Sequence, residues 1–203
     1  SEGMRFGNLD GQPATKTQIE FVSVNPTGPV HIGHGRGAVL GSTLANVLEA
    51  AGHRVQREYY VNDAGNQMDN FYRSLYARAA QALELDVQVP TDGYVGAYMI
   101  DLAREILEDA PHRKELERLI KDRPDEATKA LGPLGLTKMI DAIRKDLDAL
   151  GVVFDNWFSE RSLFASGEYE AAIKLLEEGH YLMEKDGARW FTTTRPGEAA
   201  GAV

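Results

Sequence analysis

The sequence predicts an α/β protein: a Rossmann-like parallel sheet with a mainly helical insertion that carries a small β-hairpin. Three observations predict this class. Short β-rich runs alternate with helical runs over residues 18–88, helical periodicity then dominates, and a β-rich pair with a tight turn lies near the C-terminus. Strands that alternate with helices favour a parallel sheet with right-handed crossovers. We therefore expect a lead-in at residues 1–17, the sheet domain at 18–88 and the insertion at 89–203.

The first strand and its turn follow from local composition. Residues 18–24 (QIEFVSV) are short and mostly apolar, which is typical of a buried parallel strand. Residues 25–30 (NPTGPV) hold two prolines and a glycine, so neither a strand nor a helix continues through them. Residues 4–17 are polar and rich in turn formers, so we expect a loop there.

A helix and a second strand complete the βαβ unit. The helix is expected from His31 to Gly52, where glycine is a natural C-terminal stop. Residues 54–61 (RVQREYYV) alternate and predict a strand, and residues 67–84 predict the next helix. Because parallel strands end at one edge of their sheet, the loops SVNPTGP and YVNDAGN should lie side by side, where ligands bind. The expected apolar stripe of the first helix comprises Leu40, Leu44, Val47, Leu48 and Ala51.

The insertion is expected to contain helices, one strand and one hairpin. Residues 152–160 (VVFDNWFSE) predict a strand, residues 167–178 predict a short helix, and residues 181–194 predict a hairpin with Asp186-Gly187 as its turn. The preceding helices show apolar stripes, which comprise Met99, Leu102, Ala103, Ile106 and Leu107; Leu116, Leu119 and Ile120; and Leu136, Met139, Ile140, Ile143, Leu147 and Leu150. The aromatic residues expected in the insertion core are Trp157, Phe158, Trp190 and Phe191.

Composition limits the classes of function. The chain has 203 residues, 43% of them hydrophobic, which is enough for one sizeable domain or two small ones. It has no cysteine, so disulfides and thiolate metal sites are excluded, and no apolar stretch is long enough to cross a bilayer. The formal net charge of −9 provides no global attraction to nucleic acid, although a local basic face is compatible with binding. We expect a cytoplasmic protein with no membrane partner.

The segment NPTGPVHIGHGRGAVLG carries the candidate chemistry. The start of a helix attracts phosphate through free backbone N–H groups and a positive dipole end. Gly33, Gly35 and Gly37 leave the backbone open to an adenine or a polyphosphate. His31 and His34 share a helix face, from which two imidazoles can stabilise charge during substitution at phosphorus. A tightly packed helix start with satisfied histidines is the alternative, and motif physics alone leaves it open.

Other phosphate and metal motifs fit this segment poorly. The P-loop needs a lysine and Ser or Thr after its last glycine, and the dinucleotide pattern needs a third glycine where Leu40 stands. A zinc site would need a glutamate or third ligand at metalloprotease spacing from the two histidines. We therefore assign no metal site.

The motif H-I-G-H after a strand and an N-P-T-G-P turn resembles the signature of class I aminoacyl-tRNA synthetases. With its flanks, IEFVSVNPTGPVHIGHGRGAVLGSTLANVLEAAGHRVQREYYVNDAGNQ, it resembles the first catalytic half of the bacterial-type arginyl-tRNA synthetase family. A weaker similarity to that family's connecting insertion continues through LGVVFDNWFSE and GARWFTTT. The resemblance implies the class I nucleotide-binding fold and two-step chemistry. ATP, accompanied by Mg²⁺, activates L-arginine to arginyl-adenylate, and tRNA(Arg) then accepts the arginyl group.

The resemblance also implies roles for individual residues. His31 and His34 match the histidines that stabilise the α-phosphate transition state, and Gly33 matches the glycine under the adenine. A guanidinium requires a carboxylate partner, and Glu20 matches the family's pocket glutamate. The implied site comprises the catalytic residues His31 and His34; the ATP-binding residues His31, Gly33, His34, Gly35 and Gly37; the arginine-binding residues Glu20, Ser23, Asn25 and Gln67; and the secondary residues Asn62, Asp63 and Arg36.

Three of these assignments have structural alternatives. Glu20 lies in an otherwise apolar strand where a buried, unpaired carboxylate would be costly, but it could also be an outward edge-strand residue. Asp63 either orients an amine or ribose hydroxyl, or forms an Asx turn that caps the helix from Gln67. Arg36 either contacts phosphate or pairs with an acid.

The resemblance covers only part of a synthetase. The family's second catalytic half, its loop equivalent to K-M-S-K-S and its tRNA-reading domains have no match here, and TTTRPGEAAGAV departs from the family pattern. We therefore expect a catalytic-domain fragment, truncated at its C-terminus and inactive alone, from a monomeric parent. The alternatives are a minimal nucleotidyl transferase that activates a small carboxylate, and a non-catalytic nucleotide-binding module.

Overall fold

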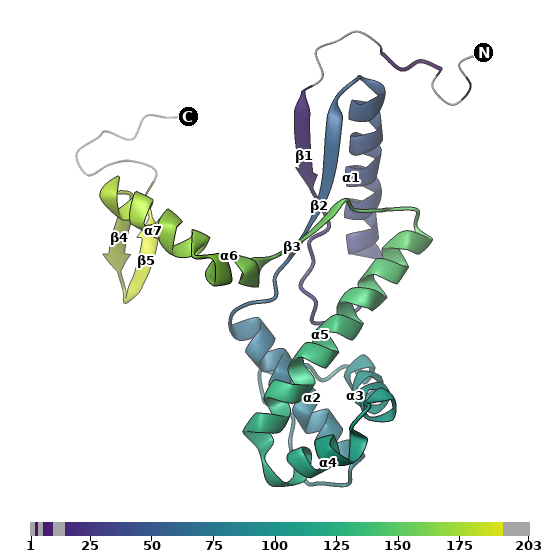
Figure 1. Cartoon of the computed structure of the whole chain (residues 1–203), viewed down its shortest axis with the longest axis vertical. Coiled ribbons are helices and arrows are strands. Elements are labelled where there is room, and N and C mark those ends of the chain that lie inside the picture. Colours follow the sequence, from purple (N-terminus) through teal and green to yellow (C-terminus); the bar gives the residue numbers. More distant parts are fainter. Residues whose placement is uncertain (1–2, 4–5, 10–14, 193–203) are drawn as a thin grey trace. The chain divides into compact units, whose positions relative to one another are not determined.

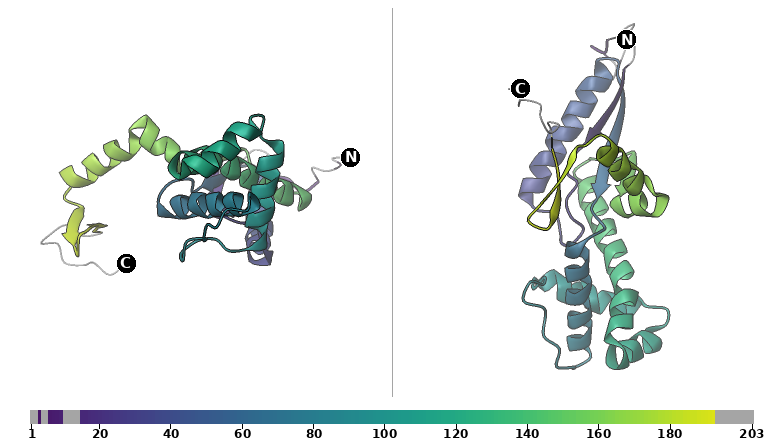
Figure 2. Two further views of the ribbon diagram at one scale, coloured as in Figure 1. Left: turned by 90° about the horizontal axis from the view of Figure 1, so that it is seen from below. Right: turned by 90° about the vertical axis from the view of Figure 1, so that its left-hand side faces the viewer.

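The computed structural model describes Gly3, residues 6–9 and residues 15–192. The chain divides into two compact units, residues 1–159 and residues 160–203 (Figures 1 and 2). Most of the expected lead-in, and the end of the expected hairpin at residues 193–194, lie outside the described residues. No helix within the described ranges is long and apolar enough to cross a membrane.

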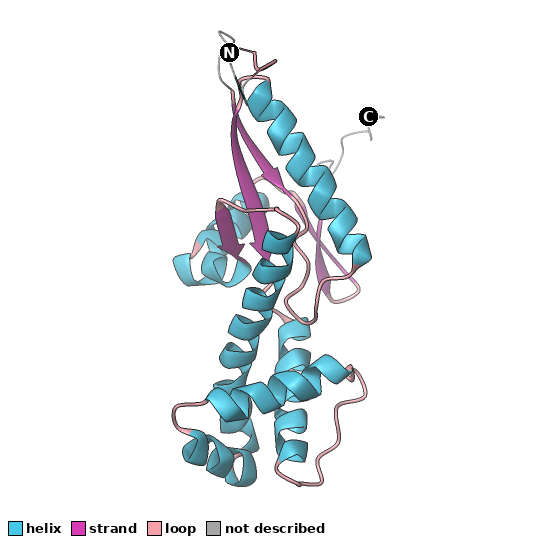
Figure 3. Ribbon diagram, turned by 90° about the vertical axis from the view of Figure 1, so that its right-hand side faces the viewer, coloured by secondary structure: helices cyan, strands magenta, loops and turns pink. Residues whose placement is uncertain are grey.

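Three parallel strands form the sheet of the first unit (Figure 3). They are β1 (Lys16–Glu20), β2 (Arg54–Val61) and β3 (Asn156–Ser159), in the spatial order β1-β2-β3. Glu58 of β2 pairs with Glu20 of β1 and with Asn156 of β3. The parallel βαβ unit is therefore confirmed, and β2 has the bounds that the sequence predicted.

β3 corrects one expectation. It lies within residues 89–203, which we expected to form the insertion, yet it extends the sheet. Its Trp157 stacks on Tyr59 of β2 with ring centroids 4.2 Å apart, so Trp157 belongs to the core of the sheet and not to an insertion core. A parallel neighbour of β2 needs a long crossover, and residues 62–155 supply it through four helices.

Helix α1 (Ile32–Ala50) approaches the sheet closely because its inward face is small. A Cβ atom at Gly41 would lie 2.3 Å from the ring of Phe21, so only a glycine admits that ring. Flanking alanines complete the contact. The buried residues of α1 are Ala38, Gly41 and Ala45.

The apolar stripe predicted for α1 faces outward instead. Leu40, Leu44 and Val47 are 70%, 48% and 58% exposed. Helical spacing correctly indicated that these residues share a face, but this face does not pack on the sheet. The sheet covers the face of small residues, because those allow the closer approach.

Four helices form a second core within the same unit (Figure 1). They are α2 (Asn66–Ala82), α3 (Ala97–Asp109), α4 (Arg113–Asp122) and α5 (Pro124–Ala149). The stripe predicted in α3 is confirmed, since all five of its residues are buried. Ile143 and Leu147 of α5 pack instead with Tyr59 of the sheet, so α5 joins the two cores.

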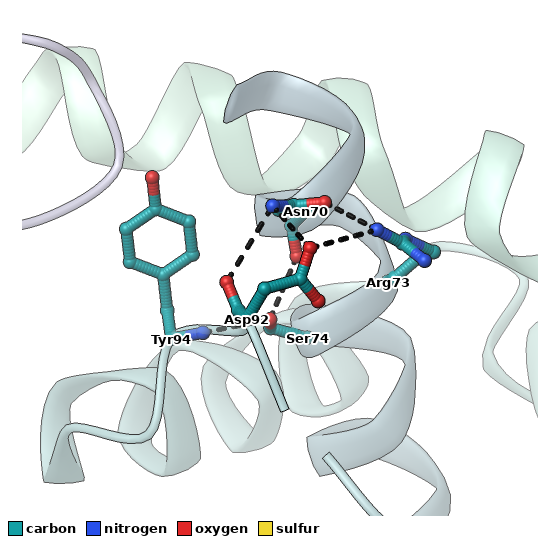
Figure 4. A network of polar contacts seen from close by, with 5 residues as sticks. All are labelled: Asn70, Arg73, Ser74, Asp92 and Tyr94. Atoms are coloured by element: carbon teal, nitrogen blue, oxygen red, sulfur yellow. Dashed lines mark hydrogen bonds and ion pairs between the residues drawn. The ribbon is translucent and has the colours of Figure 1, made fainter. Parts of the chain in front are cut away.

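A polar network fastens the loop before α3 to helix α2 (Figure 4). The Asn70 side chain donates to the Asp92 carboxylate at 2.8 Å, and Arg73 lies 3.5 Å from the same group. Ser74 Oγ donates to the Asn70 carbonyl at 2.7 Å and accepts the Tyr94 N–H at 2.9 Å. These contacts fix the position at which the chain enters α3.

The second unit contains two helices and the predicted hairpin (Figure 1). Its elements are α6 (Glu160–Ser166), α7 (Glu168–Glu178), β4 (Leu182–Lys185) and β5 (Ala188–Phe191). Asp186 and Gly187 form the predicted turn, with φ of 54° and 74° as a tight hairpin turn requires. Trp190 and Phe191 are 55% and 60% exposed, so they do not form the expected core; two strands alone provide little to pack against.

Candidate active site

The loops after β1 and β2 meet at the carboxyl edge of the sheet, as the sequence predicted. The side-chain amide of Asn25, in the first loop, donates to Gln67 Oε1 in the first turn of α2 at 2.5 Å. Asn62 and Asp63 lie between β2 and α2 at the same edge. The two most unusual loops of the sequence therefore border one site.

The chain leaves β1 through a strained turn. Val22 and Ser23 have φ of 67° and 42°, a left-handed conformation that is rare for side-chain-bearing residues and especially for β-branched ones. This turn ends β1 at Glu20, four residues before the predicted end. Ser23 Oγ accepts the N–H of Tyr60 at 3.0 Å and donates to the Phe21 carbonyl at 3.3 Å. The Ser23 hydroxyl thus stabilises the backbone of the turn.

Aromatic rings support the same turn. Phe21 packs on Phe154 with centroids 4.5 Å apart, and Tyr59 stacks on Trp157. Tyr59 is only 1% exposed, and its hydroxyl donates to the Val24 carbonyl at 2.9 Å. Burial raises the pKa of Tyr59 far above its usual range, so this hydroxyl stays protonated and remains a donor.

His31 and His34 cap the start of α1 reciprocally. The Nδ1 atom of His31 accepts the N–H of Gly33 at 3.1 Å, and the Nδ1 atom of His34 accepts the N–H of His31 at 3.2 Å. Their rings stack with centroids 3.5 Å apart, so the predicted shared face is confirmed. Burial, and next the neighbouring His31, lower the pKa of His34 and favour its neutral form. Since each Nδ1 accepts a backbone proton, each neutral ring carries its own proton on Nε2, where it can serve a ligand.

A polar cavity of about 390 Å³ opens beside this helix start. Asn25 and His34, which the resemblance assigned to the amino acid and to phosphate, line the same cavity. His31 and Arg36 instead line a larger, apolar groove of about 920 Å³. Each of the two stacked histidines therefore borders a different hollow. The remaining cavity residues are Val22, Ser23, Val24, Thr27, Gly28 and Pro29.

The three signature glycines differ in what surrounds them. A Cβ atom at Gly33 would lie 3.0 Å from the ring of His31, so this glycine makes room for the histidine cap. A Cβ atom added at Gly35 would contact only Leu150, at 3.9 Å, and one added at Gly37 would have no neighbour within 4 Å. A side chain at position 33 would therefore crowd the His31 ring, whereas packing within the described chain leaves space at positions 35 and 37.

A known family matches the sequence that builds this site. The family model described as tRNA synthetases class I (R), catalytic domain, matches residues 7–201. The chain belongs to this family. The α/β class that the sequence predicted is also the class of its solved relatives.

Curated and solved relatives of this class I synthetase chain are longer than it is. An arginine–tRNA ligase of Dehalococcoides mccartyi is 49% identical over 203 residues, which are 100% of this chain and 36% of that protein. An arginine–tRNA ligase of Syntrophotalea carbinolica is 52% identical over 97% of this chain and 35% of that protein. A Campylobacter jejuni chain, crystallised and assigned as an arginyl-tRNA synthetase, is 34% identical, with a TM-score of 0.74 over 92% of this chain and 39% of that one. The chain thus spans about a third of the length of these curated relatives.

Glu20 of this synthetase-family chain is exposed at the end of β1. The sequence argument placed it in a central strand, whereas β1 forms an edge of the described sheet. A carboxylate at an edge is hydrated and needs no buried partner. The expectation that Glu20 is buried was therefore wrong for this chain, and its pairing with a guanidinium stays a prediction.

Asp63 is 8% exposed and accepts a hydrogen bond from Ser159 Oγ at 2.6 Å. The N-cap residue of α2 is Gly65, without a side-chain cap, so the alternative in which Asp63 caps this helix was wrong. The carboxylate joins the loop after β2 to the end of β3. Asn62 is half-buried beside it, and Arg36 is exposed.

Sequence analysis missed two tyrosines that hold the turn beside the candidate site. Tyr59 of β2 donates to the Val24 carbonyl, and Tyr98 of α3 donates to the Thr27 carbonyl at 2.6 Å. The alternation in RVQREYYV could have indicated that Tyr59 faces the core. Nothing near Tyr98 signals a partner 71 residues earlier in the chain.

Proposed function

We propose that this chain forms the ATP- and arginine-binding half of the catalytic domain of an arginine–tRNA ligase. In the longer protein, a carboxylate oxygen of L-arginine attacks the α-phosphate of ATP, and pyrophosphate leaves. The terminal ribose of tRNA(Arg) then takes the arginyl group from the adenylate. The observation that carries the proposal is the stacked pair His31 and His34 at the start of α1, with His34 and Asn25 on one cavity. The names of the curated relatives support the choice of arginine.

In this proposal, His31 and His34 stabilise charge on the α-phosphate. Their Nε2–H groups donate to its oxygens, and the positive dipole end of α1 acts on the same charge. Stacking and mutual capping hold both rings before substrate arrives, so little reorganisation accompanies the reaction. Gly33, Gly35 and Gly37 let ATP approach the helix backbone. Mg²⁺ enters as part of the ATP substrate in this proposal, and no residue of this chain is assigned as its ligand.

Arginine occupies the carboxyl edge of the sheet in this proposal. Asn25 and Gln67 already bond to each other, and their amides can turn to the substrate's α-amino and carboxylate groups. Glu20 is exposed and acidic at the same strand end, which suits a guanidinium. The full proposed set is Glu20, Ser23, Asn25 and Gln67, with secondary contacts from Asn62, Asp63 and Arg36. We further propose that the longer protein acts as a cytoplasmic monomer.

Arginine-dependent ATP–pyrophosphate exchange, with and without tRNA, tests the proposal on this chain and on a full-length protein that carries it. In the full-length protein, His34→Ala is expected to lower exchange by about 100-fold or more. His112→Ala is the matched control, since His112 precedes α4 and makes no side-chain cap bond. The variant is expected to keep wild-type exchange.

Each outcome of this experiment is informative. ATP–pyrophosphate exchange in the full-length protein, with none in a folded 203-residue chain, would mean that the reaction needs parts of the longer protein that this chain lacks. ATP binding without any exchange in either protein would contradict the proposal and favour a non-catalytic nucleotide-binding module. Exchange that depends on a different small carboxylate would favour the minimal nucleotidyl transferase.

A further inference from the structure

Side chains, and not the backbone ladder, hold the turn between β1 and α1. Within the described part of the chain, no backbone-to-backbone hydrogen bond involves residues 22–30. Backbone groups that lack regular partners depend on side chains or water. The side-chain bonds that hold this turn join Ser23 Oγ to the N–H of Tyr60, Tyr59 Oη to the Val24 carbonyl, Asn25 to Gln67, and Tyr98 Oη to the Thr27 carbonyl.

Tyr98 fits against the turn closely. Its hydroxyl donates to the Thr27 carbonyl at 2.6 Å, and a Cβ atom at Gly28 would lie 3.3 Å from that hydroxyl. Thr27 is 7% exposed and Pro26 is fully buried, so the contact is shielded from water. Burial, and next the neighbouring Tyr94, raise the pKa of Tyr98, which therefore stays protonated as a donor.

We propose that Tyr98 is a positioning residue for adenylate formation, a role that rests on the function proposed above. Tyr59 and Tyr98 donate to two carbonyls, Val24 and Thr27, which lie on either side of Asn25. Asn25 lines the same cavity as the catalytic His34. When both carbonyls are held, the Asn25 side chain, which binds the amino acid, keeps its position relative to His34, which binds the phosphate.

The strained backbone explains why the turn needs this anchor. Val22 and Ser23 keep their left-handed conformation only while the surrounding structure imposes it. The network that fastens the loop before α3 to α2 fixes the helix start from which Tyr98 projects (Figure 4). Releasing the Thr27 carbonyl gives the turn a way to relax, and a small misplacement of reacting groups lowers the rate of a reaction strongly.

Tyr98→Phe removes the hydroxyl and keeps the ring, and Tyr76→Phe is its matched control. Tyr76 also donates to a backbone carbonyl, that of Ile120 at 3.4 Å, but within the helical cluster. In a full-length protein that carries this segment, Tyr98→Phe is expected to lower the kcat of arginine-dependent exchange about tenfold while KM for ATP and arginine changes less than about twofold. Tyr76→Phe is expected to keep the wild-type kcat and KM.

Hydrogen–deuterium exchange on the 203-residue chain gives a readout that does not depend on activity. In Tyr98→Phe, the backbone amides of Tyr60 and His31, which donate to the side chains of Ser23 and His34, are expected to exchange faster than in the wild type. The same amides in Tyr76→Phe are expected to keep the wild-type rate. A purely structural role for the hydroxyl would instead lower protection around α3 and leave kcat unchanged.

The two readouts separate this inference from the proposed function. Amides of Tyr60 and His31 that exchange at the wild-type rate in Tyr98→Phe would overturn the proposal that Tyr98 anchors the turn. Faster amide exchange with an unchanged kcat in an active protein would overturn the positioning role, as would an equal fall of kcat in Tyr76→Phe. A full-length wild type without arginine-dependent exchange would contradict the proposed function, and with it the role of Tyr98 in the reaction.

Discussion

The side-chain amide of Asn25 donates a hydrogen bond of 2.5 Å to Gln67, which lies 42 residues later in the chain. This bond joins the loop after β1 to the first turn of α2. Gln67 is exposed and Asn25 is half-buried, and Asn25 also lines the polar cavity beside His34. The bond therefore connects two loops at the place where the proposed substrate binds.

Gln67→Ala is expected to lower kcat/KM for arginine while changing the stability of the fold little. Losing one hydrogen bond of about 1 kcal/mol at the site predicts a fall of about fivefold in kcat/KM for arginine. Gln88→Ala is the control, because Gln88 is an exposed glutamine whose side chain donates to Asp86 at 3.2 Å, away from the candidate site. Exchange assays at varied arginine concentration on the full-length protein measure the effect. Equal falls in the two variants would remove Gln67 from the proposed site.

The His34 cap predicts that stability depends on pH. The folded-state pKa of His34 is lowered from 6.5, so full stability is present above pH 6.5, where neither state binds the proton. As the pH falls from 6.5 to the lowered pKa, the unfolded chain binds the proton and the folded chain does not. The free energy of unfolding should decrease through that window and then level off with respect to this group. Denaturant unfolding of the wild type and of His34→Gln across that pH range measures this dependence. If the free energy of unfolding of both proteins changed with pH in the same way, the prediction would be contradicted.

Features that depend on residues close together in the sequence were predicted correctly. The alternation of RVQREYYV gave β2 its observed bounds, and Asp186-Gly187 gave the hairpin turn. The spacing of His31 and His34 gave their shared face, although the reciprocal capping bonds were not foreseen. In each case residues a few positions apart carry the whole signal.

Contacts between distant segments were not predictable in the same way. Trp157 of β3 completes the sheet beside Tyr59, but the sequence between them is helical and gave no indication of the return. Periodicity found the outward stripe of α1 but could not tell which face the sheet covers. Glu20 shows the same limit, because burial of a strand residue depends on which neighbours the sheet has.

Gly41→Ala should destabilise the chain although alanine is the better helix former. The added Cβ atom would lie 2.3 Å from the Phe21 ring, which must then move away from its place beside the strained turn. Overpacking of this kind predicts a loss of about 1–3 kcal/mol in the free energy of unfolding. Gly37→Ala lies in the same helix with nothing within 4 Å, and should stabilise the chain by up to about 1 kcal/mol. Denaturant unfolding of both variants measures these changes in stability. Stabilisation by both substitutions would contradict the close contact between Gly41 and Phe21.

The outward face of α1 exposes several large apolar side chains. Ile32, Leu40 and Val47 are 93%, 70% and 58% exposed, and Leu150 of the adjoining groove is 53% exposed. Contiguous exposed apolar residues commonly mark a surface that another part of a protein covers. The curated relatives extend well beyond the length of this chain, so a longer protein has residues available to cover it.

The 203-residue chain is therefore expected to self-associate and to bind a hydrophobic dye through this face. Leu40→Lys should reduce both effects severalfold, because it places a charge in the middle of the exposed apolar surface. Leu175→Lys is the matched control: Leu175 is 69% exposed on α7, outside this face. Light scattering and dye fluorescence at varied protein concentration measure the two effects. In a full-length protein the same Leu40→Lys should instead lower the unfolding midpoint, since a lysine would then be buried against its cover. A full-length protein that tolerates Leu40→Lys as well as Leu175→Lys would show that this face stays open to water.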